Sequence, residues 1–263
     1  MYPLPTSPQP LGKVLDQGFQ LYVMTLQQAL PLSFAVAALN LLLELWLPPP
    51  VIAALPGSPE FSAEMLSWLS EVAPQLLIFA LFSLILSNAL LYRIGAFMYG
   101  RENRLGLCLG AALSRLPSVI LATLIYVAAV FAGSLFMLLP GLFLSMTLFF
   151  YMPLILLDNE GPLGALIQSH RLVWGHWWAT STLIGMAALM LLGAIGVATL
   201  LLYGLLFSVL GFDEDSVQQL LKFTNMILGA LLNPLLYAMI LATYHDLKVR
   251  REEANRHKAG LIA

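Results

Sequence analysis

The sequence predicts an all-α, polytopic membrane protein, and both its composition and its apolar runs indicate this class. Hydrophobic residues make up 60% of the 263 residues and charged residues only 10%, whereas about 25% of residues are charged in a typical soluble domain. Six apolar runs are each long enough to cross a hydrocarbon core of about 30 Å as a helix. The sequence therefore predicts a single six-helix membrane domain over residues 1–263.

Prolines and polar residues mark the ends of the apolar runs. Pro48-Pro49-Pro50 ends the first run, and Pro140-Gly141 predicts a tight turn between the third and the fourth. Before the second run, Phe61 to Ser70 is predicted to form a short surface helix, and Gly211 to Gln219 an acidic loop before the sixth. The expected spans cover about residues 26–47, 74–98, 117–139, 141–157, 177–210 and 222–244.

Lysine and arginine lie almost entirely on one side of the predicted spans. With the amino terminus in the cytoplasm, only Lys222 of the 12 Lys and Arg residues falls on the opposite side. Cytoplasmic loops of membrane proteins carry an excess of Lys and Arg, so we expect both termini, including the charged tail 245–263, in the cytoplasm. The cytoplasmic cations are Lys13, Arg93, Arg101, Arg104, Arg115, Arg171, Lys248, Arg250, Arg251, Arg256 and Lys258.

Short amphipathic segments precede three of the spans, and we expect them to lie in the cytoplasmic membrane interface. In the most distinctive one, Gly161-Pro162 opens a helix that leads to a cluster of three tryptophans, whose rings prefer the level of the lipid headgroups. A Leu-Gly pair opens each segment, which suggests three repeats of an interfacial helix plus a transmembrane hairpin. The pairs are Leu11-Gly12, Leu105-Gly106 and Leu163-Gly164.

The residue pattern predicts no catalytic, metal or cofactor site. His170 and His176 are six residues apart, which places them on different faces of a helix. The single cysteine, Cys108, excludes an intrachain disulfide. The sequence contains no HExxH, Gly-rich phosphate loop or GxSxG motif. We therefore expect no enzymatic activity, no metal, no cofactor and no nucleic-acid partner.

Asn40, Asn88 and Asn233 lie near the middle of the first, second and sixth predicted spans. Polar groups at this depth are costly and are usually paired. They favour interhelical hydrogen bonds that fix packing, typically about 0.6 kcal/mol per pair, over a polar pocket of the kind a small transporter uses. Four glycines on one face of the fifth span predict close helix packing, within the bundle or between copies in a homo-oligomer; they are Gly185, Gly193, Gly196 and Gly204.

Two stretches resemble a known family. The first stretch is similar to a Tyr-x-Asp-Leu-basic-x-Arg-basic-Glu pattern; it is Tyr244-His245-Asp246-Leu247-Lys248-Val249-Arg250-Arg251-Glu252. The second is similar to a Pro-Gly turn followed by a Gly-Pro-Leu-x-Ala-Leu motif that ends in Trp-Trp. It consists of Pro140-Gly141 and the residues from Gly161 to Trp178. Both resemble YciC-like bacterial inner-membrane proteins, a family without an assigned activity. The layout also resembles the membrane domain of some glycerophosphodiester phosphodiesterases. The resemblance implies a bacterial inner-membrane location and lends no catalytic residues.

The functional hypothesis rests on the basic rim at the cytoplasmic interface. Arg171 and the basic end of the sixth helix, beside the tryptophans, are predicted to bind anionic phospholipid, because basic pockets between helices hold such headgroups. We expect a non-enzymatic scaffold or envelope-maintenance factor that contacts anionic lipid or partner proteins. The alternatives are cations that only set orientation, and a small transporter or lipid-handling protein that uses the midplane amides. The predicted lipid-binding residues are Arg171, Trp174, Trp177, Trp178, Lys248, Arg250 and Arg251.

Overall fold

The computed structural model describes residues 2–47 and 57–260, with side chains described through His257. The regular structure of these residues is helical, and six helical segments are long and apolar enough to cross a membrane. The prediction of an all-α polytopic protein is therefore confirmed. In chain order the elements are α1 (Leu11–Trp46), α2 (Pro59–Met98), α3 (Leu105–Phe136), α4 (Leu138–Thr147), α5 (Tyr151–Asp158), α6 (Pro162–Val173), α7 (Trp177–Tyr203), the π-helix η1 (Gly204–Val209) and α8 (Glu214–Gly260).

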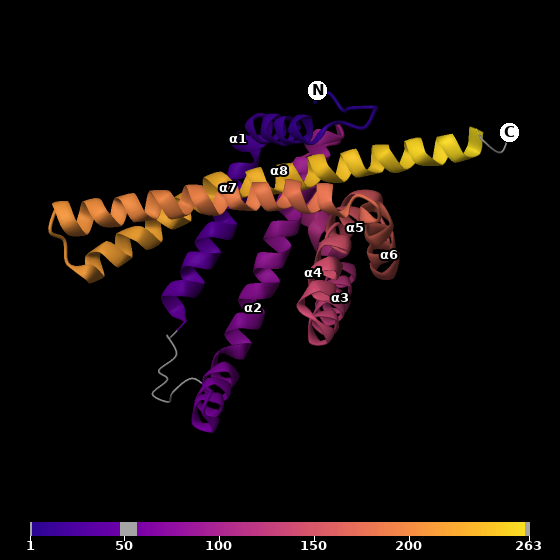
Figure 1. Ribbon diagram of the computed structural model, residues 1–263. Helices are drawn as coiled ribbons and strands as arrows, with labels where there is room; N and C mark the ends of the chain where they lie inside the picture. Colours follow the sequence, from indigo (N-terminus) through magenta and orange to yellow (C-terminus); the bar gives the residue numbers. More distant parts are fainter. Residues whose placement is uncertain (1, 48–56, 261–263) are drawn as a thin grey trace.

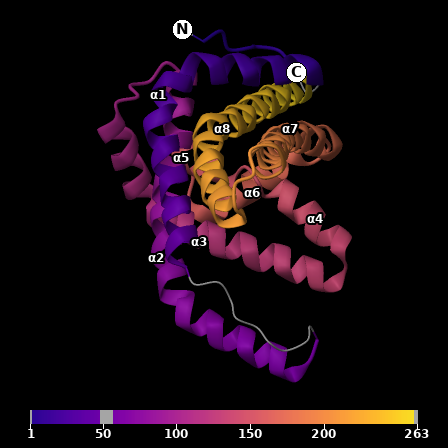
Figure 2. The same ribbon diagram turned by 90° about the vertical axis from the view of Figure 1, so that its left-hand side faces the viewer.

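The buried core lies at one end of the bundle in two large clusters that share α5 and α8; one adds mainly α1 and α2, and the other mainly α3 and α6. In α2 the buried residues other than Val72 begin at Asn88, and in α7 the last buried residue is Ala187. From this end α1 and α2, α3 and α4, and α7 and α8 extend in different directions, as Figures 1 and 2 show. Their far halves expose large apolar side chains such as Leu135 and Leu200, which suits surfaces that face lipid tails.

The first interfacial segment and the first span form one bent helix, α1, and not two separate elements. The first part of α1 lies across α8, and the second part turns away beside α2 (Figures 1 and 2). Pro31 lies inside α1, and an internal proline removes a backbone hydrogen bond and bends a helix. Gly18 allows the close approach to α8, because a Cβ there would lie 3.2 Å from Met239 Cα.

Helices α2 and α8 begin before the predicted second and sixth spans. The predicted surface helix Phe61 to Ser70 is continuous with α2, which begins at Pro59. In the same way, α8 begins at Glu214, inside the predicted acidic loop. Ser58 and Asp213 explain these starts, because each accepts a backbone N–H of the first turn. The predicted stop of the first span, residues 48–50, lies outside the described residues.

The turn between the third and fourth spans lies at Met137 and not at Pro140-Gly141. Pro140 falls in the first turn of α4, where the N–H that proline lacks would have no intrahelical partner. Gly141 instead permits close packing of α4 on α3, because a Cβ there would lie 3.0 Å from Ser134 Cα. The fourth span is also divided, since α4 ends at Thr147 and α5 begins at Tyr151.

The Leu-Gly pairs predicted to open three segments do lie at helix starts. Leu11 and Leu105 are the first residues of α1 and α3, and Leu163 is the second residue of α6. Only the third unit has a separate short helix where an interfacial helix was predicted, because α6 and α7 are divided at Gly175, where the chain has φ +86°. The segment at the start of α3 continues into its span, as in α1.

Candidate functional site

Ser169 holds α6 against the break between α4 and α5. Its hydroxyl donates to the carbonyl oxygen of Thr147 at 2.8 Å and accepts the backbone N–H of Phe150 at 3.0 Å. Both of these backbone groups lie where the helix is interrupted, so a buried side chain supplies the partners that a continuous helix would supply. This contact fixes α6, and with it Arg171, relative to α5.

Asp158, at the end of α5, connects that helix to α8. Its Oδ2 accepts hydrogen bonds from the Tyr244 hydroxyl at 2.6 Å and from Lys248 Nζ at 2.7 Å. Lys248 Nζ also lies 5.4 Å from the centroid of the Tyr244 ring. Asn159 then turns the chain toward α6 in the left-handed region, at φ 63°. Asp158 and Asn159 therefore bring the end of α5 and the start of α6 close to α8.

A pocket of about 270 Å³ lies between α5, α6 and α8. The α8 residues lie at i, i+3, i+4 and i+7, and the α6 residues at i, i+3 and i+4, so each helix presents one face to the pocket. Three side chains of the lining are cationic and two are acidic. The lining residues are Leu154, Asp158, Gln168, Arg171, Leu172, Lys248, Arg251, Glu252 and Asn255.

The charges of this pocket are only partly paired. Lys248 forms its ion pair with Asp158, and Glu252 lies 3.7 Å from the exposed Arg256. Among the residues that the structure describes, no side chain forms a hydrogen bond or ion pair with Arg171 or Arg251. Two guanidinium groups, each with donors that match the oxygens of a phosphate or carboxylate, are therefore available to a ligand.

A family model described as a domain of unknown function, DUF7847, matches residues 53–247. The chain belongs to the DUF7847 family. The match includes α5 and α6 and ends one residue before Lys248. No curated protein and no solved structure matches the chain.

The structure separates Arg250 of this DUF7847 protein from the predicted lipid-binding group. Its Nε donates to Asp246 Oδ2 at 2.6 Å, and its guanidinium also donates to the carbonyl oxygen of Gln9. Asp246 Oδ1 accepts the backbone N–H of Gln9 at 2.9 Å. Arg250 therefore fastens the amino-terminal segment to α8 and does not line the pocket, so its predicted contact with lipid stays a prediction. Arg171, Lys248 and Arg251 do meet in the pocket, as predicted.

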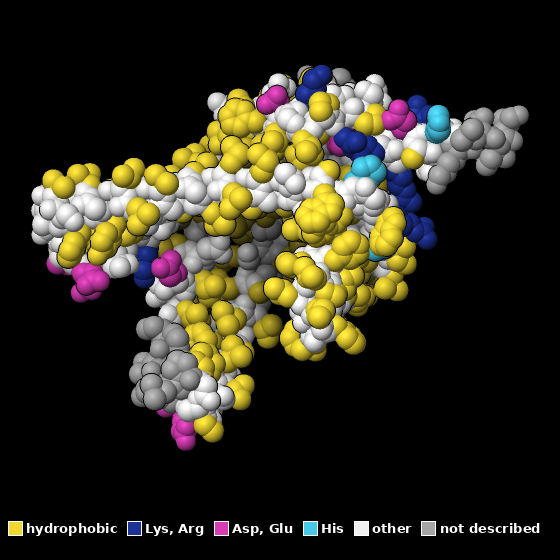
Figure 3. Space-filling model, viewed as in Figure 1, with side chains coloured by type: hydrophobic (Ala, Val, Ile, Leu, Met, Phe, Trp, Pro, Cys, Tyr) yellow, Lys and Arg dark blue, Asp and Glu magenta, His cyan; other side chains and the backbone are white. Residues whose placement is uncertain are grey.

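The three tryptophans do not line the pocket. Trp174 and Trp178 are 63% and 79% exposed. Trp177 is half-buried and stacks on Phe143, with 5.9 Å between the ring centroids. In Figure 3, Lys and Arg side chains gather toward the two ends of the chain, whereas hydrophobic side chains cover the long helices below. Exposed indole rings at such a boundary are typical of the headgroup level.

Of the three asparagines predicted at the membrane midplane, two come together and the third lies apart. Asn40 and Asn233 line a second pocket, of about 160 Å³, between α1 and α8. Asn88 is fully buried elsewhere, and no described residue makes a hydrogen bond with either atom of its amide. The predicted interhelical hydrogen bond is therefore wrong for Asn88, and the side chains of Asn40 and Asn233 form none with a described residue either.

The glycine face of the fifth span makes no close contact with the other described elements. A Cβ at Gly185, Gly193, Gly196 or Gly204 would meet no heavy atom within 4 Å. Packing of this face inside the bundle is therefore wrong, and packing between copies stays a prediction.

Four polar residues of the first pocket were not predicted from the sequence; they are Asp158, Gln168, Glu252 and Asn255. One signal could have found two of them. Glu252 and Asn255 lie four and seven residues after Lys248, on the same face of a helix. Asp158 and Gln168 depend on how Ser169 holds α6 against the break between α4 and α5, which no local pattern reveals.

Proposed function

We propose that this protein is a non-enzymatic membrane protein that binds the headgroup of an anionic phospholipid in the pocket between α5, α6 and α8. Its place would be the bacterial inner membrane, with this pocket at the cytoplasmic leaflet, in keeping with the resemblance to YciC-like proteins and with the distribution of Lys and Arg. One observation carries the proposal. Arg171 and Arg251 come from different helices into one pocket, and no described anionic group pairs with either.

The size and surroundings of the pocket favour a headgroup as its ligand. Its volume of about 270 Å³ lies just below the range of about 300–1,000 Å³ that holds a drug-sized molecule, so a phosphate with part of its glycerol suits it better than a whole lipid. The exposed rings of Trp174 and Trp178 are close in sequence to Arg171, one directly after α6 and the other at the start of α7. A bound lipid would tie α6 to α8, which fits a scaffold or envelope-maintenance role.

Native mass spectrometry of the purified protein with phosphatidylglycerol and cardiolipin tests the proposal. The test variant combines Arg171→Ala with Arg251→Ala. Each basic residue near an anionic surface contributes about 1 kcal/mol, so we expect lipid binding roughly 30-fold weaker in the double variant. Arg104→Ala is the matched control, because Arg104 is an exposed cation before α3 that does not line the pocket. Equal retention in the double variant and the parent would reduce these arginines to signals for orientation.

A small transporter or lipid-handling protein is the second candidate function. The observation that favours it is the shared pocket of Asn40 and Asn233 between α1 and α8. A polar pocket within candidate spans is the kind of site that such proteins use near the membrane midplane. Transport assays in proteoliposomes, with a variant that fills this pocket, would separate it from a purely structural role.

A further inference from the structure

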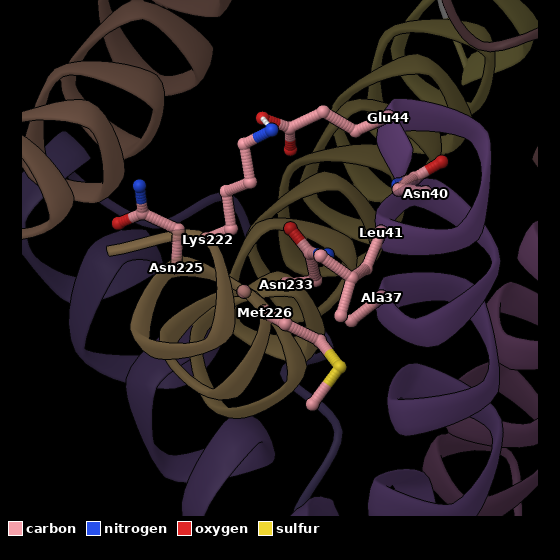
Figure 4. A pocket seen from close by; sticks show the side chains of 9 residues that line it. Ala37, Asn40, Leu41, Glu44, Lys222, Asn225, Met226 and Asn233 are labelled. Carbon is pink, nitrogen blue, oxygen red and sulfur yellow. Dashed lines mark ion pairs between the residues drawn. The ribbon is translucent and has the colours of Figure 1, made fainter. Parts of the chain in front are cut away.

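The pocket between α1 and α8 is built from two regularly spaced polar faces. Its α1 residues lie at i, i+3, i+4 and i+7, and its α8 residues at i, i+3, i+4, i+7 and i+11, so both helices turn one side toward it. Figure 4 shows the side chain of Lys222 extending from α8 toward Glu44 of α1, with Asn233 between the two helices. The lining residues are Ala37, Asn40, Leu41, Glu44 on α1 and Lys222, Asn225, Met226, Gly229, Asn233 on α8.

The ion pair in this pocket is loose. Lys222 Nζ lies 3.5 Å from Glu44 Oε1, whereas charge-assisted hydrogen bonds usually measure about 2.7–2.9 Å. In the other pocket, Lys248 Nζ and Asp158 Oδ2 are only 2.7 Å apart, within hydrogen-bond distance. Lys222 and Glu44 make no further hydrogen bond to a described residue, so both charges keep free hydrogen-bonding positions.

The amides around the pair are also largely unpaired. Asn225 accepts a hydrogen bond from the Thr199 hydroxyl at 2.8 Å. Within the described part of the chain, the side chains of Asn40 and Asn233 form no hydrogen bond. Each amide offers two donors and one acceptor oxygen. The pocket therefore presents one cation, one anion and two free amides to whatever enters it.

Setting the orientation in the membrane does not explain Lys222. It is the only Lys or Arg between Arg171 and Lys248 in the sequence, and it falls on the side of the predicted topology where the positive-inside rule disfavours cations. Lys222 is the first residue of the predicted sixth span, and ionisable residues that enter a spanning segment are commonly paired and mark a functional site. The ion pair with Glu44 offsets part of the cost of placing a charge at this position. It does not account for the long distance of 3.5 Å between the two charged groups.

We propose that this pocket binds a phosphoethanolamine headgroup, with Lys222 on the phosphate and Glu44 on the primary ammonium. Asn233 and Asn40 would supply further hydrogen bonds to the two charged ends. This goes beyond the proposed function, because it assigns a second site with a different ligand class to the other end of α8.

The balance of charges selects this class of ligand. One cation and one anion sum to zero, so a zwitterion is matched better than a net anion such as phosphatidylglycerol. A choline headgroup is matched less well, because its quaternary ammonium has no N–H to donate and is usually held by aromatic rings. The lining contains no aromatic residue.

The surface beside the pocket favours a lipid as the source of this headgroup. Leu42 and Leu45 on α1 and Phe223 and Ile227 on α8 are exposed apolar residues next in sequence to lining residues. They offer apolar surface for acyl chains next to the polar site. The headgroup alone and the whole lipid share one chemistry, so the experiment includes both.

Native mass spectrometry of the full chain in detergent, with phosphatidylethanolamine and phosphatidylcholine of identical acyl chains, tests the proposal. We expect at least tenfold preferential retention of phosphatidylethanolamine, and loss of this preference in Lys222→Met and in Glu44→Gln. Glu214→Gln is the matched control, because Glu214 is an acid at the start of α8 that does not line the pocket. Equal retention of the two lipids by the parent protein would overturn the proposal.

A pocket-filling variant guards against a failure of folding. A Cβ at Gly229 meets only Asn233 Nδ2, at 3.8 Å, so Gly229→Leu places a side chain in the pocket without a clash at its first atom. We expect Gly229→Leu to lose the preference while its thermal unfolding matches that of the parent. An unchanged preference in this stable variant would overturn the proposal.

Two further measurements identify the source and separate this site from the first. Displacement of the lipid by free phosphoethanolamine would show that the headgroup suffices, and no displacement would show that the acyl chains contribute; both results support the site. Arg171→Ala with Arg251→Ala should leave the preference for phosphatidylethanolamine intact. Loss of this preference in that double variant would place the lipid in the other pocket and overturn the proposal.

Discussion

The hydroxyl of Ser169 lies 3.0 Å from the backbone nitrogen of Phe150, a residue of the break that divides the fourth span. A side chain of α6 thereby does for α4 and α5 what the next turn of a helix would do. The contact with α6 therefore stabilises the interruption. The short helix that carries Arg171 is thus connected to the core of the membrane domain, and does not merely rest on its surface.

Replacing Ser169 by Ala should destabilise the protein. The change leaves the Phe150 N–H and the Thr147 carbonyl without their buried partner, and an unsatisfied buried group costs about 1–3 kcal/mol. Thermal unfolding in detergent measures the effect as a lower Tm. Ser145→Ala is the control, because the Ser145 hydroxyl donates only to the Leu142 carbonyl three residues earlier, at an exposed position. An equal Tm for both variants would contradict this account of the break.

The pair of Lys248 and Asp158 should show energetic coupling. Both side chains are partly exposed, so we expect a modest coupling energy of about 1 kcal/mol. A double-mutant cycle with Asp158→Asn and Lys248→Met measures it, and the asparagine keeps an acceptor for the Tyr244 hydroxyl. The exposed pair of Arg256 and Glu252, at 3.7 Å, provides a second cycle in which we expect almost no coupling. Strictly additive effects at Asp158 and Lys248 would show that their contact does not stabilise the fold.

The spans could be predicted from the sequence because hydrophobicity over some twenty residues is a local property. The meeting of Arg171 with Lys248 and Arg251 could also be predicted, since all three were placed at one level of the membrane. Depth alone does not give the direction of a side chain around its helix. Arg250 and Arg251 are neighbours in sequence, yet a turn of about 100° per residue directs one toward Asp246 and the other into the pocket.

Other features depend on contacts between distant parts of the chain. The break before α5 requires Ser169, 19 residues after Phe150. The turn was predicted at Pro140-Gly141, but it lies at Met137. The first turn of a helix tolerates a proline, so Pro140 need not mark the end of α3. Asn88, Asn40 and Asn233 have similar predicted depths, but only their rotation around the helix axes decides which of them reach a pocket.

Topology is the third prediction. We expect reporter fusions at Gly57 and Asp215 to lie on one side of the membrane and fusions at Arg104, Arg171 and Arg256 on the other. The reason is the excess of Lys and Arg at the second group of positions. Reporters that are active on only one side of the membrane measure this directly. A tail fusion that reports the same side as the fusion at Gly57 would contradict the six-span arrangement.

The last prediction concerns Asn88, for which the structure reverses the expectation from sequence. Replacing a hydrogen-bonded asparagine by leucine would lower the stability of the fold. Asn88, however, is fully buried, and within the described chain neither amide atom has a hydrogen-bond partner. An unpaired buried polar group costs about 1–3 kcal/mol, and leucine has the same number and branching of side-chain heavy atoms as asparagine. We therefore expect Asn88→Leu to raise the free energy of unfolding by on the order of 1 kcal/mol.

Thermal unfolding in detergent checks this, with Asn103→Leu as the matched control. The Asn103 amide donates to the side-chain oxygen of Gln28, so that substitution should lower the Tm while Asn88→Leu raises it. If Asn88→Leu lowered the Tm as much as Asn103→Leu does, Asn88 would have a hydrogen-bond partner in the folded protein. Asn88 would then be a paired polar group among the buried residues of α2.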